Sequence, residues 1–322
     1  MALLLAELSG ITDILSNGPS LDAEDVLLSA DRPNYNRLMV RSWDVAGDLP
    51  PVDLRPLISA ERAELLSFLR SLDESGWAAP TANVGWNVHD VALHLLGGGL
   101  GRLGSSPSVA AREGRLAFDD LAGLIERSNE EWVRAARRIA PKVTVELLAF
   151  IGPLVDDAFA ALDLDAPGTS VAWTGDGPTP YWLDIAREYT ERWVHHAQMR
   201  SAMGAPPLVE RRFLHPVLDT FMRSLPRAYE AVEADDGTRV DVVVEGEAGG
   251  RWTLRREADR WHLVPPDEQV AAACVRIPQD VAWKVLSRTI AVPEALPEIV
   301  IERDERLGRP ATQAVAIMTT QA

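Results

Sequence analysis

Glu191 and His195 are spaced so that both side chains could bind one metal ion. They lie in the run from Tyr181 to Met203, which has the pattern of a helix. Four residues are slightly more than one helical turn, so the two side chains project from one helix face about one turn apart. A third ligand must come from elsewhere, and His94 is the best-placed candidate. Taken singly, the pair could be an ordinary exposed ion pair, and His94 could be a buried or capping histidine.

The cysteine content limits the kind of metal site that this chain can build. Cys274 is the only cysteine among 322 residues. A single cysteine excludes an internal disulfide framework and a cysteine-rich zinc site, and it is consistent with a reducing cytosol. Because it falls in a predicted strand far from Glu191 in sequence, we interpret it as a buried apolar side chain and not as a nucleophile. Any metal site must therefore use histidine and carboxylate ligands.

Charge and hydropathy narrow the class of partner and the location. The formal net charge of −16 argues against a nucleic-acid partner, because binding phosphates requires clustered lysine and arginine. The apolar start at Met1 has no basic flank and meets Glu7 early, so we predict no signal peptide. No stretch is long and apolar enough for a membrane span. We expect a cytoplasmic monomer or homodimer that acts on small molecules and has no membrane partner.

Apolar residues at three- and four-residue spacing predict helices through the first two thirds of the chain. The predicted helices span about 58–72, 86–96, 117–140, 144–162, 181–203 and 210–230. The second carries His94 and leads into a run with glycines at 97, 98, 99 and 101, which either ends the helix or lets another helix approach closely. The fifth carries the Glu191 and His195 pair and ends at Gly204.

The pattern changes after about residue 235, where alternating apolar and polar residues predict strands. Predicted strands lie at 239–245, 251–255, 260–264, 271–277 and 298–303, with helices at 279–287 and 311–318. The first three strands read as hairpins, which predicts an antiparallel-type sheet. The predicted organisation is an appendage at 1–48, a helical domain at 49–207 and a smaller α+β domain at 208–322. One alternative for the appendage is that natural translation begins at Met39.

Three motifs carry a family resemblance. They are Trp86-Asn-Val-His-Asp-Val-Ala-Leu-His94-Leu, Trp182-Leu-Asp-Ile-Ala-Arg-Glu-Tyr-Thr-Glu191-Arg-Trp-Val-His195-His and Arg200-Ser-Ala-Met-Gly204. Together they resemble the mycothiol-dependent maleylpyruvate isomerase family of actinobacteria, within the DinB-like metalloprotein superfamily. The resemblance covers roughly residues 50–205, and the remainder is more loosely similar to a sterol-carrier-like domain.

The resemblance implies the fold class α + (α+β), in which a DinB-like four-helix bundle precedes a smaller α+β domain. It also implies a divalent metal, usually zinc, bound by His94, Glu191 and His195. Mycothiol would serve as the thiol cofactor or co-substrate. Zinc with three protein ligands keeps a position for water or substrate, as catalytic sites do.

Several functions share these ligands. A metal-activated thiolate could add to a conjugated double bond and leave again, as in an isomerase, or stay attached to an electrophile, as in an S-transferase. The alternatives are a non-catalytic metal-binding or ligand-carrier protein and a metal-dependent hydrolase that uses zinc-bound water. The leading interpretation is an isomerase or S-transferase acting on a small electrophile.

Four further residues are candidates for supporting roles. Arg102 and Arg200 could hold a carboxylate-bearing substrate or thiol, although most arginines at such positions lie on the surface. Asp90, one turn before His94, could accept the second N–H of a ligating histidine, although a solvated aspartate in a first helical turn is the plainer interpretation. His196 points about 100° away from His195 around the helix, which favours a surface or supporting position.

Overall fold

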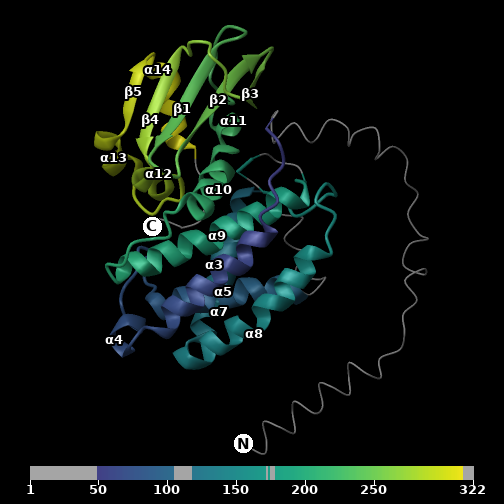
Figure 1. Cartoon of the computed structure of the whole chain (residues 1–322), viewed down its shortest axis with the longest axis vertical. Coiled ribbons are helices and arrows are strands. Elements are labelled where there is room, and N and C mark those ends of the chain that lie inside the picture. Colours follow the sequence, from purple (N-terminus) through teal and green to yellow (C-terminus); the bar gives the residue numbers. More distant parts are fainter. Residues whose placement is uncertain (1–48, 105–117, 172, 175–177, 315–322) are drawn as a thin grey trace, which may run out of the picture. The chain divides into compact units, whose positions relative to one another are not determined.

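The computed structural model describes residues 49–104, 118–171, 173–174 and 178–314 (Figure 1). The predicted appendage at 1–48 lies outside this part of the chain. Helices fill the first part of the described sequence, and a mixed sheet with short helices follows. The protein is therefore of the α+β type, in the order that the sequence predicts.

The helices of the first part lie close to their predicted ranges, except that the short helix at 74–77 was not predicted and the one that begins at Val88 runs on to Gly104. They are α3 (Arg55–Arg70), α4 (Glu74–Trp77), α5 (Val88–Gly104), α7 (Phe118–Ala136), α8 (Pro141–Ala160) and α9 (Tyr181–Ala202). α8 packs on α3 and α5, α9 packs on α3 and α5, and α7 packs on α5. A cluster of buried apolar side chains from α3, α5 and α8, joined by Met199 of α9, forms the core among these helices.

Helix α5 continues through the glycine-rich run, up to Gly104. It begins with reciprocal hydrogen bonds between Asn87 and Asp90, in which each backbone N–H donates to the other side chain, at 3.1 Å and 2.9 Å. The run serves close packing: a Cβ added at Gly97 would lie 2.4 Å from Trp132 Nε1, and one at Gly99 would lie 2.7 Å from Ile151 Cδ1. Close approach is therefore observed at Gly97 and Gly99, whereas a Cβ at Gly98 would meet nothing within 4 Å.

Helix α9 is buried on nearly every side, with 16 of its 22 residues in the interior. It contacts α3 and α5 on one flank and α10 (Arg211–Met222) on the other, as Figure 1 shows. A helix enclosed in this way can hold polar side chains only where they find partners, because an unpaired buried polar group costs free energy. Asp184, Glu188, His195 and Gln198 of α9 have such partners, whereas Thr190 Oγ1 and His196 Nε2 have none among the described residues.

The sheet has five strands in the order β3-β2-β1-β4-β5. They are β1 (Arg239–Glu245), β2 (Gly250–Glu257), β3 (Arg260–Val264), β4 (Ala273–Pro278) and β5 (Val300–Arg303). The β1–β2, β2–β3 and β4–β5 pairs are antiparallel, but β1 and β4 are parallel, with Val242 opposite Val275. The sheet is therefore mixed, which corrects the antiparallel prediction. Local alternation identifies a strand and leaves its partner open, and β4 joins the free edge of β1 instead of following β3.

Short helices accompany the sheet. They are α11 (Leu225–Ala228), α12 (Gln279–Leu286), α13 (Val292–Ala295), η2 (Leu296–Glu298), α14 (Glu305–Gly308) and η3 (Arg309–Gln313). The predicted helix at 311–318 is a 3₁₀ turn where it is described, and residues 315–322 lie outside the described part. No helix in the described ranges is long and apolar enough to cross a membrane.

A second apolar core joins the helical part to the sheet. It runs without a break from Leu54 and Ile58 through α9 and α10 to the buried face of the sheet. Trp193 of α9 meets Trp283 of α12 edge to face, with ring centroids 5.4 Å apart. Helix α12, which packs on β1 and β4, therefore also contacts the helix that carries Glu191 and His195.

Candidate metal centre

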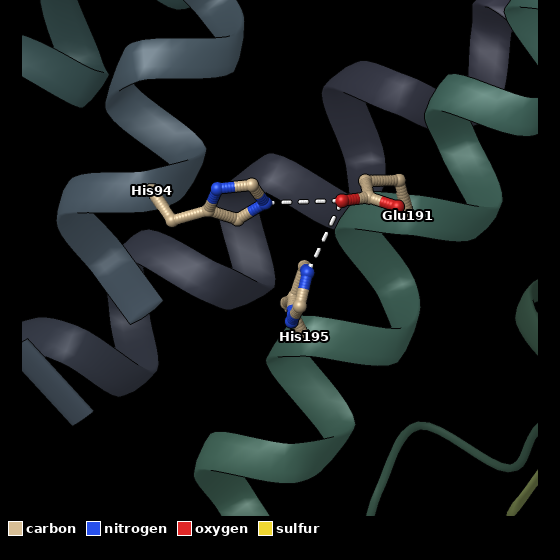
Figure 2. Close-up of side chains that lie close together, drawn as sticks. All are labelled: His94, Glu191 and His195. Carbon is tan, nitrogen blue, oxygen red and sulfur yellow. Dashed lines mark hydrogen bonds and ion pairs between the residues drawn. The ribbon is translucent and has the colours of Figure 1, made fainter. Parts of the chain in front are cut away.

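His94, Glu191 and His195 converge on one point between α5 and α9 (Figure 2). Nε2 of His94 lies 3.0 Å from Oε1 of Glu191, and Nε2 of His195 lies 3.1 Å from the same oxygen. One ligand atom from each residue lies within 4.8 Å of the other two. The two imidazole rings meet edge to face, 4.8 Å apart. Two nitrogens and one carboxylate oxygen facing one another are a donor set suited to a divalent metal ion.

The helix packing explains why the third residue of this cluster comes from α5. Glu191 and His195 share one face of α9, as their spacing predicts, and α5 packs on α9 with His94 turned toward that face. The ring of Trp86, just before α5, lies against the His94 ring with centroids 5.3 Å apart. Its Nε1 donates to Oε2 of Glu130 on α7 at 2.8 Å. Trp86 therefore forms a wall beside His94.

Exposure decreases across the cluster. The side chain of Glu191 is 21% exposed, that of His94 is 12% exposed and that of His195 is 3% exposed. A ligand from solvent would consequently approach from the side of Glu191 and His94, while His195 forms the closed end of the site.

The ionisation of Glu191 follows from its two histidine neighbours. Burial alone would raise the pKa of Glu191, but the charge and hydrogen bond of His195, together with those of His94, outweigh burial and hold this pKa well below its usual range. The carboxylate is therefore anionic, as a metal ligand must be.

Gln198, which the sequence analysis did not single out, orients His195. Its Oε1 lies 2.8 Å from Nδ1 of His195 and also accepts from Nδ2 of Asn83 at 2.8 Å. An amide oxygen can only accept, so Nδ1 of His195 is the donor to Gln198, and Nε2 is the nitrogen that faces Glu191. A histidine whose Nδ1 is held in this way presents Nε2 as the nitrogen that would bind a metal. The sequence feature that could have identified Gln198 is its position about one turn after His195 in the same helix.

Arg102 does not face the cluster as a free cation. Its Nη1 and Nη2 donate to both carboxylate oxygens of Asp184 at 2.8 Å, and its Nε donates to Glu188 at 3.2 Å. Asp184 and Glu188 are buried on α9, so Arg102 neutralises carboxylates of this chain. These are its observed partners, and a contact with a substrate carboxylate stays a prediction.

Arg200 and Asp90 also lie apart from the three converging side chains. Arg200 stacks on the ring of Phe68, donates from Nε to the carbonyl of Pro206 at 2.6 Å, and lines a separate pocket of about 540 Å³. The carboxylate of Asp90 accepts from Arg137 at 2.8 Å and 3.1 Å in addition to capping α5. Its observed partners are therefore Arg137 and Asn87, and the predicted contact with His94 is replaced by them.

His196 is deeply buried, and the surface position considered for it is wrong. Only 1% of the residue is exposed, and its Nδ1 lies 2.8 Å from Oε1 of Glu61, which is itself fully buried on α3. Its ring also lies 5.6 Å from that of Phe68. His196 therefore holds α9 to α3 and is not part of the cluster. The sequence pattern of α9 did not predict the burial of His196, because this helix is enclosed on nearly every side and has no clear exposed face.

Two histidines and a glutamate presented by two packed helices define the class as a helical protein with a donor set for a divalent metal. Residues 58–200, which include all three side chains, match the family described as the mycothiol maleylpyruvate isomerase N-terminal domain. The match confirms, over this part of the chain, the family resemblance that the motifs around His94 and Glu191 carry.

Two solved structures are also similar to the chain. A crystal structure of the mycothiol-dependent maleylpyruvate isomerase matches with a TM-score of 0.48 and 10% identity, and a histidine-to-alanine mutant matches with a TM-score of 0.45 and 11% identity. Each comparison covers 79% of this chain and 94% of the other. At these low identities and TM-scores the two structures add nothing to the family match. No curated protein sequence matches the chain significantly.

Proposed function

We propose that the protein is a metal-dependent and mycothiol-dependent isomerase or S-transferase that acts on a small electrophile. His94, Glu191 and His195 would hold the metal, for which zinc is the best fit to the donor set. The observation that carries the proposal is the convergence of two Nε2 atoms and one Oε1 within 4.8 Å, inside the segment that matches the family. The proposed frame is a four-helix bundle of α3, α5, α8 and α9 within residues 49–207, followed by a sterol-carrier-like domain at 208–322. We place the protein in the cytoplasm.

A divalent ion held by His94, Glu191 and His195 would favour the thiolate form of a bound thiol and would so supply a nucleophile at neutral pH. The residues of the chain supply the orientation. Glu191 contributes a negative charge, and Gln198 keeps Nε2 of His195 turned toward Glu191. The buried end at His195 and the wall of Trp86 leave the side of Glu191 and His94 for the thiol and the electrophile.

Metal analysis of single variants tests the site. In His94→Ala, Glu191→Ala and His195→Ala we expect the affinity for zinc to fall by more than roughly 100-fold, because removing a ligand must cost more than removing one of its supporting residues. The matched control is His89→Gln on the same helix α5, where His89 contacts Thr144 at 3.1 Å. This control should bind zinc like the unchanged protein. Full metal occupancy in all three alanine variants would show that these residues are not the metal ligands.

A turnover assay then tests the reaction. The zinc-loaded protein is incubated with mycothiol and maleylpyruvate, or with epoxide and haloaryl probes, and thiol consumption and product geometry are followed. An isomerase returns the thiol, whereas an S-transferase consumes it. Hydrolysis of ester or amide probes without thiol would replace the proposal by a metal-dependent hydrolase. Metal binding without turnover across the panel would point to a non-catalytic metal or ligand carrier.

A further inference from the structure

The side-chain amide of Gln198 joins three distant parts of the chain. Its Oε1 contacts His195 Nδ1 on α9 and accepts from Asn83 in the loop before α5, each at 2.8 Å. Its Nε2 donates to the hydroxyl of Thr289, just beyond α12, at 2.9 Å. Gln198 is only 1% exposed, so these contacts account for its buried polar atoms.

The directions of these hydrogen bonds are mutually consistent. The hydroxyl of Thr289 accepts from Gln198, which leaves its own hydrogen for Ser287 Oγ at 2.8 Å. Ser287 in turn donates to the carbonyl of Lys284 at 3.3 Å. The amide nitrogen of Gln198 is held toward Thr289, so its oxygen must face His195. A chain of donors therefore runs from His195 to the end of α12.

The backbone after α12 places Thr289 where it can reach α9. Arg288 adopts a φ of +60°, in the left-handed region, directly after the helix ends at Leu286. The N–H of Ile290 then donates to the carbonyl of Lys284 at 3.2 Å, which closes the turn. The packing of Trp193 against Trp283 holds α12 on α9. The hydroxyl of Thr289 is therefore presented by a fixed turn.

We propose that Thr289 is a positioning residue for the metal centre, which acts through Gln198 to hold His195 in its ligating orientation. The C-terminal part of the chain thereby contributes to the metal affinity of the helical part. This inference rests on the proposed metal site. A partner that fixes the second nitrogen of a ligating histidine sets the ring orientation and tautomer, and its loss typically weakens metal binding about 10- to 100-fold.

Metal affinity of the full chain tests the inference. Zinc is titrated into the metal-free protein in competition with a chromophoric chelator, so the readout does not depend on activity. We expect Thr289→Val to weaken zinc binding roughly three- to ten-fold and Gln198→Met about 10- to 100-fold. Thr289→Ser, which keeps the hydroxyl, should restore the affinity. Thr289→Ala serves if the valine variant fails to fold.

Two controls separate positioning from a general loss of stability. Thr312→Val removes another buried threonine hydroxyl of the C-terminal part, which donates to the carbonyl of Arg309 at 2.8 Å, and should leave zinc affinity unchanged. The double variant Gln198→Met with Thr289→Val should bind zinc less than about two-fold more weakly than Gln198→Met alone, because the effects of coupled residues are not additive.

Each outcome decides one claim. If the unchanged protein binds zinc and the Thr289→Val and Thr289→Ala variants bind it equally well, the positioning role is wrong while the metal site stands. If Thr289→Ser or Thr312→Val weakens zinc binding as much as Thr289→Val does, the positioning role is also wrong. If the unchanged protein binds no zinc, the proposed function fails together with this inference.

Discussion

Replacing Arg102 with methionine separates two roles for this arginine. The sequence allows it to hold a substrate carboxylate, whereas in the structure it donates to Asp184 and Glu188. Methionine keeps a long unbranched side chain and removes the charge. We expect Arg102→Met to lower the stability of the protein and to leave the KM for the electrophilic substrate unchanged.

The expected loss follows from the burial of the carboxylates. The side chains of Asp184 and Glu188 are 1% and 9% exposed, and removing one partner from a buried charge pair costs about 3–5 kcal/mol. Arg187 remains 3.1 Å from Asp184, and Arg192 remains 3.0 Å from Glu188. Because both carboxylates keep one cation, we expect the lower end, about 3 kcal/mol. This corresponds to a fall in Tm of roughly 6–12 °C.

The loss of stability caused by Arg102→Met should depend on pH. Burial alone would raise the pKa of Glu188, but the charges of Arg102, Arg192 and Arg187 outweigh burial and lower this pKa from 4.5 to about 2. A lowered pKa contributes stability that is present above pH 4.5 and is lost as the pH falls toward 2. Without Arg102 the pKa of Glu188 rises, so less of this stability remains to be lost. The difference in stability between the two proteins should therefore narrow in this window.

Urea unfolding followed by circular dichroism at pH 7 and at pH 3 measures both effects. The single variant Asp184→Asn and the double variant Arg102→Met with Asp184→Asn complete a double-mutant cycle. The loss of unfolding free energy in the double variant should be smaller than the sum of the two single losses, because the two residues are in contact. An unchanged urea midpoint for Arg102→Met, combined with a raised KM, would refute the reasoning and return Arg102 to ligand binding.

Two further predictions concern α5 and the single cysteine. Gly97→Ala should destabilise the protein by about 1–3 kcal/mol, because the new Cβ meets Trp132, whose Nε1 is tied to the carbonyl of Leu93 at 2.7 Å. Gly98→Ala meets nothing within 4 Å and should raise Tm slightly, so equal Tm values for the two variants would contradict the packing account. Cys274 is 4% exposed, and burial raises the pKa of its thiol. It should react with a disulfide reagent only after unfolding, and rapid labelling of the folded protein would contradict this.

The predictable part of the fold is local. Apolar residues at three- and four-residue spacing located the main helices, and alternation located the strands, because these periodicities reflect which face of an element is buried. The parallel pairing of β1 with β4 was not predictable in this way, since the partner of a strand depends on the path of the chain. The predicted closing helix at 311–318 is a 3₁₀ turn up to Gln313, and its residues from 315 on lie outside the described part.

The sequence by itself determined that Glu191 and His195 share one helix face, because their separation of four residues matches the helical turn. It also left histidine and carboxylate as the available ligands, since Cys274 stands alone. Only the tertiary structure brought His94 to 3.0 Å from Glu191, paired Arg102 with Asp184 and Glu188, and linked Gln198 to Thr289.

These contacts join residues that lie roughly 80 to 100 positions apart in the chain, and they depend on how α5, α9 and α12 pack. Helical spacing carries no information about which face of a second helix will meet the first. The partner of each buried charge was therefore decided by packing, because an enclosed polar group must be paired wherever the fold places it.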